Sequence, residues 1–387
     1  MLQRNMNRDV DDNTNRNTNE TRAGLLLVGA APPPSGGIAV HMDDLARGAR
    51  ALGARVRIAD VPPGVSRSSA SASRLIAQLV AARARGDLMH LHTNGHNDGS
   101  WRLIRLVGGV GGASALLTIH SGLAPSYIAA HAESSRDLCR AFARVVCVSE
   151  AIATALQNTG VERSRLVVAP AFSSALLPPA LAPAGLAAIR RRHAALVAAT
   201  LGRGVEYGGA VLLDAFYLLR RNMPDAGLLL YGPGARDPML DGQIRARDLG
   251  RAIYRVGDLA RAEALGAIAA ADLFVRPTLA DGDSVSVREA LALGVRALAS
   301  DAAPRPPGVR LFAAGNAVAL AAAMRASLDE PRPAPTPCDG TAPVFAIYRA
   351  AGVVEEPLAG PHESTLLTVA PLRRDAQTGA TTAAEGR

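Results

Sequence analysis

The stretch DLFVRPTLADGDSVSVREALALGVRALAS (272–300) decides the fold of this chain. Residues 272–277 are mostly apolar and end in arginine and proline, which predicts a buried strand that stops abruptly. After a polar loop, REALAL has the composition of a helix, and VRALAS (295–300) predicts the next strand. A strand, a helix and a second strand in this order are typical of a parallel α/β sheet.

The same alternation extends outward over most of the chain. An apolar stripe of Ile38, Met42, Leu45, Ala49 and Leu52 predicts an amphipathic helix. Proline and an arginine cluster interrupt the pattern at about 175–196, and GGVGG (108–112) is expected to be a loop. Other helices are expected at 208–222, 319–328 and 344–351. Further strands are expected at 23–30, 55–60, 88–92, 115–120, 144–149, 165–170, 197–203, 227–234 and 253–257.

This pattern predicts an α/β protein of two Rossmann-like, doubly wound lobes that face each other across a cleft. The first 22 residues are polar and are expected to be a disordered leader without a secretory signal. The expected boundaries are 23–180 for the first lobe, 181–196 for a linker, 197–330 for the second lobe, 331–354 for a C-terminal crossover helix and 355–387 for a disordered tail.

The composition excludes several classes of enzyme. All 42 cationic residues are arginine, because the sequence contains no lysine. A Walker A nucleotide-binding loop, a protein kinase and a Schiff-base or pyridoxal-phosphate enzyme all require a lysine. Aromatic residues make up only 3% of the chain, so bases would find few stacking partners despite the net charge of +8. We therefore expect no nucleic acid partner.

The chain has no apolar run long enough to predict a membrane-spanning helix, and its three cysteines are too scattered for a disulfide framework. A reduced, cytoplasmic location is expected. The excess of arginine also allows a peripheral contact with anionic lipid at the inner face of the membrane.

Two loops carry candidate ligand-binding residues. Gly36 and Gly37 open directly into the first predicted helix, where free N–H groups would attract an anion, although an ordinary strand–helix turn has the same composition. Asp281 and Glu289 are eight residues apart and could converge on sugar or ribose hydroxyls. The alternative is structural, because Ser286 and Glu289 also match the spacing of a helix capping box.

Histidines form the third candidate group. His90 and His92 share one face of a predicted strand, and His96 and Asp98 follow it. Metal binding is the less favoured interpretation, because no convincing set of ligands accompanies them. We expect polar residues at a strand end and no metal. His120 lies alone at the end of another apolar strand, where a hydrogen-bonded structural role and a catalytic one both remain open.

Taken in order, these motifs resemble the retaining glycosyltransferases of family 4, the group 1 glycosyltransferases, which have the GT-B fold. The family pattern has a strand ending in Pro-Ser/Thr, two acidic residues eight apart, an "EAMA" helix and a following strand. Here the acidic positions are Asp281 and Glu289, and the helix reads Glu-Ala-Leu-Ala. The resemblance covers roughly 24–330 through the segments 33–58, 118–122, 145–152, 228–234 and 276–301.

The resemblance implies a role for each matching residue. Asp281 would bind the donor sugar, Glu289 the nucleotide ribose, and His120 would lie beside the sugar as the third catalytic residue. Arg203 would neutralise the diphosphate, with Arg276 or Arg288 in support. The remaining donor-binding positions would be Gly36, Gly37, Gly232, Gly234, Asp283, Ser284, Val285 and Ser286.

The implied activity is retaining, metal-independent transfer of a sugar from a nucleotide-diphosphate sugar to a glycan or lipid-linked acceptor, in bacterial cell-envelope polysaccharide synthesis. The first lobe would face the acceptor, the second would bind the nucleotide-sugar, and no cofactor would be needed. The sequence departs from the family at two places. Tyr207–Gly208 replaces the usual Lys-Gly, and Gly282–Asp283–Ser284 replaces Gly-Phe-Gly. A GT-B nucleotide-sugar epimerase and a non-catalytic GT-B scaffold therefore remain alternatives.

Overall fold

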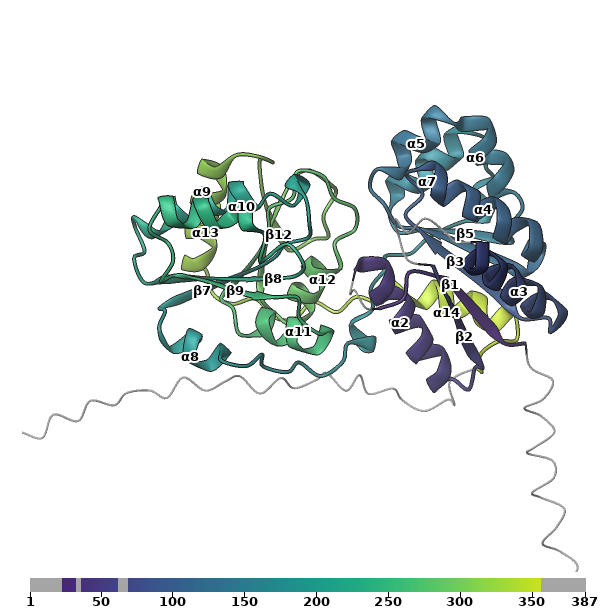
Figure 1. Ribbon diagram of the computed structural model, residues 1–387, viewed down its shortest axis with the longest axis horizontal. Helices are drawn as coiled ribbons and strands as arrows, with labels where there is room; N and C mark the ends of the chain where they lie inside the picture. Colours follow the sequence, from purple (N-terminus) through teal and green to yellow (C-terminus); the bar gives the residue numbers. More distant parts are fainter. Residues whose placement is uncertain (1–22, 33–35, 62–68, 356–387) are drawn as a thin grey trace, which may run out of the picture.

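The computed structural model describes residues 23–32, 36–61 and 69–355 (Figure 1). The predicted leader at 1–22, the predicted tail apart from Glu355, and Pro34–Ser35 of the first glycine loop lie outside the described residues. The described part forms two α/β lobes, each built on a parallel six-stranded sheet. This confirms the predicted two-lobe fold.

The N-terminal lobe has the strand order β2-β1-β3-β4-β5-β6. Its strands are β1 (Leu25–Gly29), β2 (Val56–Asp60), β3 (Leu88–Thr93), β4 (Ala115–Ile119), β5 (Arg144–Cys147) and β6 (Leu166–Val168). Its helices are α2 (Gly37–Ala51), α3 (Ser69–Ala84), α4 (Asp98–Gly111), α5 (Ala124–Ala130), α6 (Ala132–Cys139) and α7 (Glu150–Asn158).

The C-terminal lobe has the order β12-β11-β10-β7-β8-β9, and α8 (Leu186–Arg191) lies in the connection between the lobes. Its strands are β7 (Ala195–Thr200), β8 (Ala226–Tyr231), β9 (Ile253–Gly257), β10 (Leu273–Arg276), β11 (Arg296–Ser300) and β12 (Val309–Phe312). Its helices are α9 (Gly209–Arg220), α10 (Pro238–Ala246), α11 (Arg261–Ala269), α12 (Val285–Ala292) and α13 (Ala317–Asp329).

Burial on both faces of each sheet explains why the strands read as continuous apolar runs. In β1, Leu25 and Leu27 belong to one core cluster, while Leu26 and Val28 belong to another on the opposite face. The C-terminal lobe likewise has two core clusters. Successive residues of β7 and β8 belong alternately to one cluster and the other. The sheets are therefore rigid platforms, and the loops at their edges are free to carry chemistry.

The last helix, α14 (Ala342–Ala350), returns to the N-terminal lobe (Figure 1). Phe345 and Tyr348 belong to the same core cluster as Met42 and Leu45 of α2. Tyr348 is fully buried. The chain therefore crosses between the lobes twice, once near α8 and once before α14.

One prediction about local structure is wrong. The GGVGG segment at 108–112 was expected to be a loop, but 108–111 form the last turn of α4. A side chain at Gly108 would lie 2.9 Å from the Phe142 ring, so the helix needs this glycine in order to pack closely. Packing at this contact outweighs the low helix propensity of glycine.

Candidate functional site

The candidate residues come from the places where the strand order reverses in each sheet. In the N-terminal lobe this switch lies between β1 and β3, and in the C-terminal lobe between β7 and β10. Loops that leave the carboxyl ends of such strands form the ligand sites of doubly wound sheets. Gly36, His92, Arg203 and Asp281 all follow or end one of these four strands.

Two helix N-termini meet at the lobe interface. Gly36 caps α2 with extended backbone, and α2 begins at Gly37. A side chain placed on Gly37 would come no closer than 4.0 Å to Cγ2 of Val285, the first residue of α12. The free N–H groups and positive dipole ends of both helices are therefore close together, which suits an anionic ligand.

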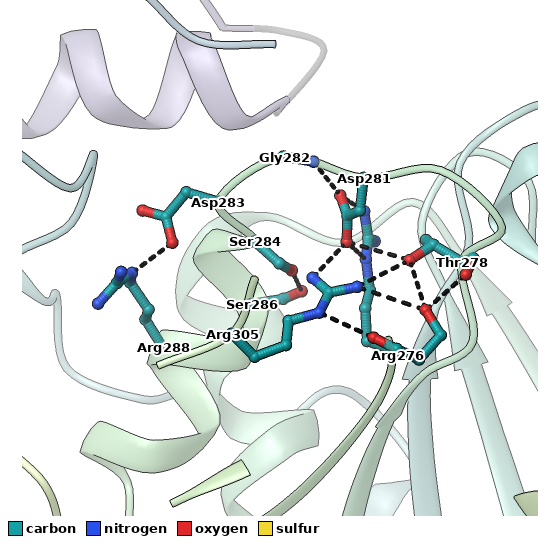
Figure 2. Close-up of polar contacts among 10 residues, drawn as sticks. Arg276, Thr278, Asp281, Gly282, Asp283, Ser284, Ser286, Arg288 and Arg305 are labelled. Atoms are coloured by element: carbon teal, nitrogen blue, oxygen red, sulfur yellow. Dashed lines mark hydrogen bonds and ion pairs between the residues drawn. The ribbon is translucent and has the colours of Figure 1, made fainter. Parts of the chain in front are cut away.

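Asp281 is held by two arginines (Figure 2). Arg276 forms two hydrogen bonds to it, at 3.0 and 3.1 Å, and Arg305 donates a third at 2.8 Å. Thr278 Oγ1 and the Gly282 N–H also donate to this carboxylate. Burial alone raises the pKa of Asp281, but the two guanidiniums outweigh it and lower the pKa to about 2. The three side chains together carry one net positive charge.

Asp283 and Arg288 point away from this cluster (Figure 2). Asp283 accepts a hydrogen bond from Arg288 at 2.7 Å, and Arg288 also approaches the Cys338 sulfur. Burial raises the pKa of Asp283, and Arg288 opposes that shift. Ser284 is the N-cap of α12, and its hydroxyl contacts that of Ser286 at 3.2 Å. Of the two arginines expected to support the diphosphate, Arg288 is therefore paired with Asp283 and Arg276 with Asp281.

Glu289 is not part of a capping box. Helix α12 begins at Val285, so Ser286 lies inside the helix and cannot be its N-cap. The Glu289 side chain is buried, and its Oε1 lies 3.4 Å from the Arg261 guanidinium. Burial raises the pKa of Glu289, Arg261 opposes this, and Asp44 of the N-terminal lobe raises it further. Glu289 therefore faces the lobe interface, as a ligand-binding residue would.

Four histidines from α2, β3 and the loop after β4 cluster beside the N-terminal sheet. His90 contacts the Tyr348 hydroxyl at 2.6 Å and Thr118 at 2.7 Å, which gives it a structural role. His92 Nδ1 contacts His120 Nε2 at 3.2 Å, and the His41 ring packs edge-on against both.

Burial lowers the pKa of all four imidazoles. The pKa of His41 falls to about 3, with a contribution from Arg261, and that of His90 also falls to about 3. Those of His92 and His120 lie well below the usual value. The four rings are therefore neutral at physiological pH. His41, His92 and His120 bring one nitrogen each within 4.8 Å of one another, and His120 is the part-exposed member.

The predicted diphosphate residues occupy the loops after β7 and β8. Arg203 is exposed and forms no hydrogen bond or ion pair with the described residues, so its guanidinium is free to meet a ligand. Tyr207 packs under Arg276, whose guanidinium carbon lies 5.3 Å from the ring centroid. Gly232 and Gly234 form backbone hydrogen bonds that hold the β8 loop against Gly257 and Leu201.

Loops from opposite lobes touch beside His120. A side chain on Gly122 would lie 2.0 Å from the carbonyl oxygen of Asp281, and one on Gly282 would lie 3.0 Å from the carbonyl oxygen of His120. The contact places the backbone of Asp281 and Gly282 in one lobe against the backbone of His120 and Gly122 in the other.

The sequence interpretation missed four residues at this interface, His41, Asp44, Arg261 and Arg305. His41 and Asp44 lie within the buried face of α2, where polar residues inside an apolar stripe were an available signal. Arg305 follows β11, and its side chain is only 2% exposed. Nothing in its local sequence, APRPPG, distinguishes it from a solvent-exposed loop arginine.

Comparison with known proteins supports the two-lobe fold. Residues 194–330 match the family model of the group 1 glycosyl transferases. No curated protein sequence matches the chain.

Among solved structures, HepE of Anabaena in complex with UDP and glucose is 17% identical, with a TM-score of 0.60 over 79% of this chain and 90% of that one. Sucrose-phosphate synthase of Thermosynechococcus elongatus is 18% identical, with a TM-score of 0.58 over 86% and 96%. A putative UDP-N-acetylglucosamine 2-epimerase of Listeria monocytogenes is 14% identical, with a TM-score of 0.59 over 87% and 98%.

Within the described ranges, no helix combines the length and apolar character needed to cross a bilayer. The two sheets, the loop contact at His120 and the match over 194–330 lead to one assignment. The chain has the GT-B fold, and residues 194–330 of its C-terminal lobe match the group 1 glycosyl transferase model.

Proposed function

We propose that this protein is a retaining glycosyltransferase that moves a sugar from a nucleotide-diphosphate sugar to a polysaccharide, oligosaccharide or lipid-linked acceptor. One observation carries the proposal: the N-terminus of α12, inside the matched domain, lies near that of α2 from the other lobe, since a Cβ on Gly37 would be 4.0 Å from Cγ2 of Val285. Two helix N-termini this close suit the diphosphate of a leaving nucleotide.

In the proposed reaction the bond between the sugar anomeric carbon and the diphosphate oxygen breaks, and its electron pair leaves with the nucleotide. The acceptor hydroxyl oxygen forms the new bond on the same face of the sugar and gives its proton to the leaving phosphate oxygen. The protein supplies positioning and charge, since negative charge develops on the diphosphate. The proposal requires neither a metal ion nor a cofactor.

The residues divide this work by position. Arg203 and the one net positive charge of Arg276, Asp281 and Arg305 would balance the diphosphate. Backbone N–H groups from Asp283 to Ser286 would bind the phosphate or the sugar, and Glu289 would hold the ribose. His120, neutral and beside the 281–282 loop, would accept or donate a hydrogen bond at the sugar.

The experiment is a binding and turnover screen with UDP-, GDP- and ADP-sugars. We expect one nucleotide family to raise the melting temperature and the purified protein to release its nucleoside diphosphate in the presence of an acceptor. A ligand at 100 times its dissociation constant adds about 2.7 kcal/mol of stability. Release should be lost in Glu289→Ala. The function is wrong if no nucleotide-sugar binds, or if Asp281→Ala and Glu289→Ala both retain full turnover.

Two alternatives each have an observation in their favour. The similarity in fold to a putative epimerase favours nucleotide-sugar epimerisation, which NMR of the sugar product would reveal. Tyr207 near the usual lysine position favours a non-catalytic scaffold, which would bind no nucleotide.

A role in bacterial cell-surface glycan synthesis at the cytoplasmic face of the membrane completes the proposal. If flotation with anionic liposomes leaves the protein unbound, the membrane contact is wrong.

A further inference from the structure

Three charged side chains join the lobes beside the histidines. Asp44 lies on α2 of the N-terminal lobe, and Arg261 and Glu289 lie on α11 and α12 of the C-terminal lobe. Arg261 Nη2 is 2.9 Å from Asp44 Oδ2 and 3.4 Å from Glu289 Oε1. The Asp44 and Glu289 side chains are 1% and 8% exposed, so the arrangement is shielded from solvent.

Most of the hydrogen-bonding capacity of this group is unused. Among the described residues, no nitrogen of the Arg261 guanidinium forms a hydrogen bond of acceptable geometry, although two carboxylates lie nearby. Oδ2 of Asp44 and both ring nitrogens of His41 are also without a hydrogen-bond partner. Buried polar groups in folded proteins nearly always have partners, so this concentration indicates the place of a polar ligand.

The balance of charge restricts what that ligand can be. One guanidinium lies between two carboxylates, and the neighbouring His41 is neutral, so Asp44, Arg261 and Glu289 by themselves carry one net negative charge. Arg47 pairs with the other oxygen of Asp44, but from the solvent side, where its side chain is 40% exposed. A phosphate would meet two carboxylates here and would be repelled.

A neutral vicinal diol fits this group better. Each hydroxyl can donate one hydrogen bond to a carboxylate and accept one from the guanidinium. A carboxylate, a guanidinium and a second carboxylate in a row thus match the donors and acceptors of two adjacent hydroxyls. Hydrogen bonds to charged partners are the stronger kind, so such a site would select strongly for its hydroxyls.

We propose that Asp44 and Arg261 complete a ribose-diol site together with Glu289, one carboxylate from each lobe. This inference rests on the proposed function, which assigns Glu289 to the ribose of the donor nucleotide. It adds two residues that would bind the ribose hydroxyls, Arg261 in the same lobe as Glu289 and Asp44 in the other lobe. Nucleotide binding then draws α2 of the N-terminal lobe against the C-terminal lobe, so that ribose recognition and closure of the lobes become one event.

The test compares a nucleoside diphosphate with its 2′,3′-dideoxy analogue. Calorimetry first identifies which of UDP, GDP and ADP the wild-type protein binds, and then measures the dideoxy form of that nucleotide. Because the probe lacks the transferred sugar, ribose is its only diol. We expect wild type to bind the ribonucleotide about 100-fold more tightly, and Arg261→Gln and Asp44→Asn to reduce this ratio to about tenfold or less. Affinity for the dideoxy form should hardly change.

A matched control and a conservative variant keep the result interpretable. Arg190 pairs with Asp272 before the start of β10, at the opposite edge of the sheet, and Arg190→Gln should keep the wild-type ratio. Arg261→Lys should recover part of the ratio, because a donor is retained there.

Each remaining outcome is decisive. If wild type does not distinguish the two nucleotides, the site does not read ribose and the inference is overturned. If only Glu289→Gln lowers the ratio, Asp44 and Arg261 play no part, although the proposed function stands. If wild type binds none of the nucleotides or their sugars, both the inference and the proposed function are overturned.

Discussion

The two lobes share a parallel six-stranded design but present opposite chemistry to each other. The N-terminal lobe gathers four imidazoles beside its sheet, three of them buried and His120 part-exposed, and the lowered pKa values leave all four rings neutral. The C-terminal lobe lines its edge with ion pairs, in which Arg276 and Arg305 keep Asp281 charged. The same topology can thus support a neutral surface on one side of an interface and a charged one on the other.

The difference assigns a task to each lobe. Paired charges at the edge of the C-terminal sheet suit a nucleotide diphosphate, and this is the lobe that matches the glycosyltransferase model. Neutral imidazoles suit hydroxyl groups, because each ring can donate or accept a hydrogen bond without a charge to neutralise. Asp44 is the exception in the N-terminal lobe, since it pairs with Arg261 of the other lobe.

Lowering the pH should have the largest effect of all, and it should lower the stability of the N-terminal lobe before that of the C-terminal lobe. Buried His41 and His90 resist protonation down to about pH 3, whereas in the unfolded chain they take up protons near pH 6.5. Stability of the N-terminal lobe is therefore full above pH 6.5 and falls as the pH drops towards 3. Proton uptake by these two residues in the unfolded chain should lower the free energy of unfolding by about 5 kcal/mol between pH 6 and pH 4.

Urea denaturation followed by fluorescence of Trp101, the one tryptophan, reports this lobe. His41→Gln should reduce the pH slope by about 1.4 kcal/mol per unit. The exposed His131 is the control position for substitution as such, and His131→Gln should change the free energy of unfolding at pH 7 by less than about 0.5 kcal/mol. A slope in His41→Gln equal to that of wild type would contradict the account.

In the C-terminal lobe the corresponding test is Asp281→Asn. Because Arg276 and Arg305 would lose their buried counter-charge, we expect a loss of about 3–5 kcal/mol in the free energy of unfolding. The stabilisation by Asp281 is present above pH 3.8 and is lost as the pH falls towards 2, a range that overlaps only the lower end of the one in which the histidines act. Urea denaturation at pH 7 measures the cost. A loss below 1 kcal/mol would show that the ion pairs of Asp281 with Arg276 and Arg305 do not stabilise the fold.

The contact between the lobes is tested by Gly122→Ala. Its methyl group would lie 2.0 Å from the Asp281 carbonyl oxygen, so the two loops must separate. We expect turnover to fall about 100-fold, since misplacement of about 1 Å has effects of that size. Gly109→Ala, where a methyl group meets nothing within 4 Å, is the control. If the Gly122 variant transfers sugar at the wild-type rate, the contact is unimportant for catalysis.

The smallest expected effect is that of Arg203→Ala. This exposed side chain forms no hydrogen bond or ion pair with the described residues, so the free energy of unfolding should change by less than about 0.5 kcal/mol. Affinity for the nucleoside diphosphate should still fall about tenfold, because a charged donor to phosphate is lost. Calorimetry and urea denaturation on the same variant give both numbers. Unchanged affinity would mean that Arg203 does not bind the diphosphate. Arg276 alone would then take the place of the lysine found in the family pattern.

The fold was predictable because each strand is a separate apolar run, and such runs keep their character even when packing shifts their ends. Strand β12 was missed, since VRLF is short and follows a proline-rich turn. The acidic loop was predictable because Asp281 and Glu289 belong to one continuous motif. The partners of these residues were not, because Arg305, Arg261 and Asp44 come from distant segments and only the folded sheets bring them together.

The central claim is that the two lobes together bind a nucleotide-sugar. Calorimetric titration of the wild-type protein and Glu289→Gln with UDP-, GDP- and ADP-sugars tests it most directly. The account predicts that wild type binds the sugars of one nucleotide at a single site and that Glu289→Gln binds them at least tenfold more weakly. Absence of binding to any of these sugars, or equal affinity in the variant, would contradict it.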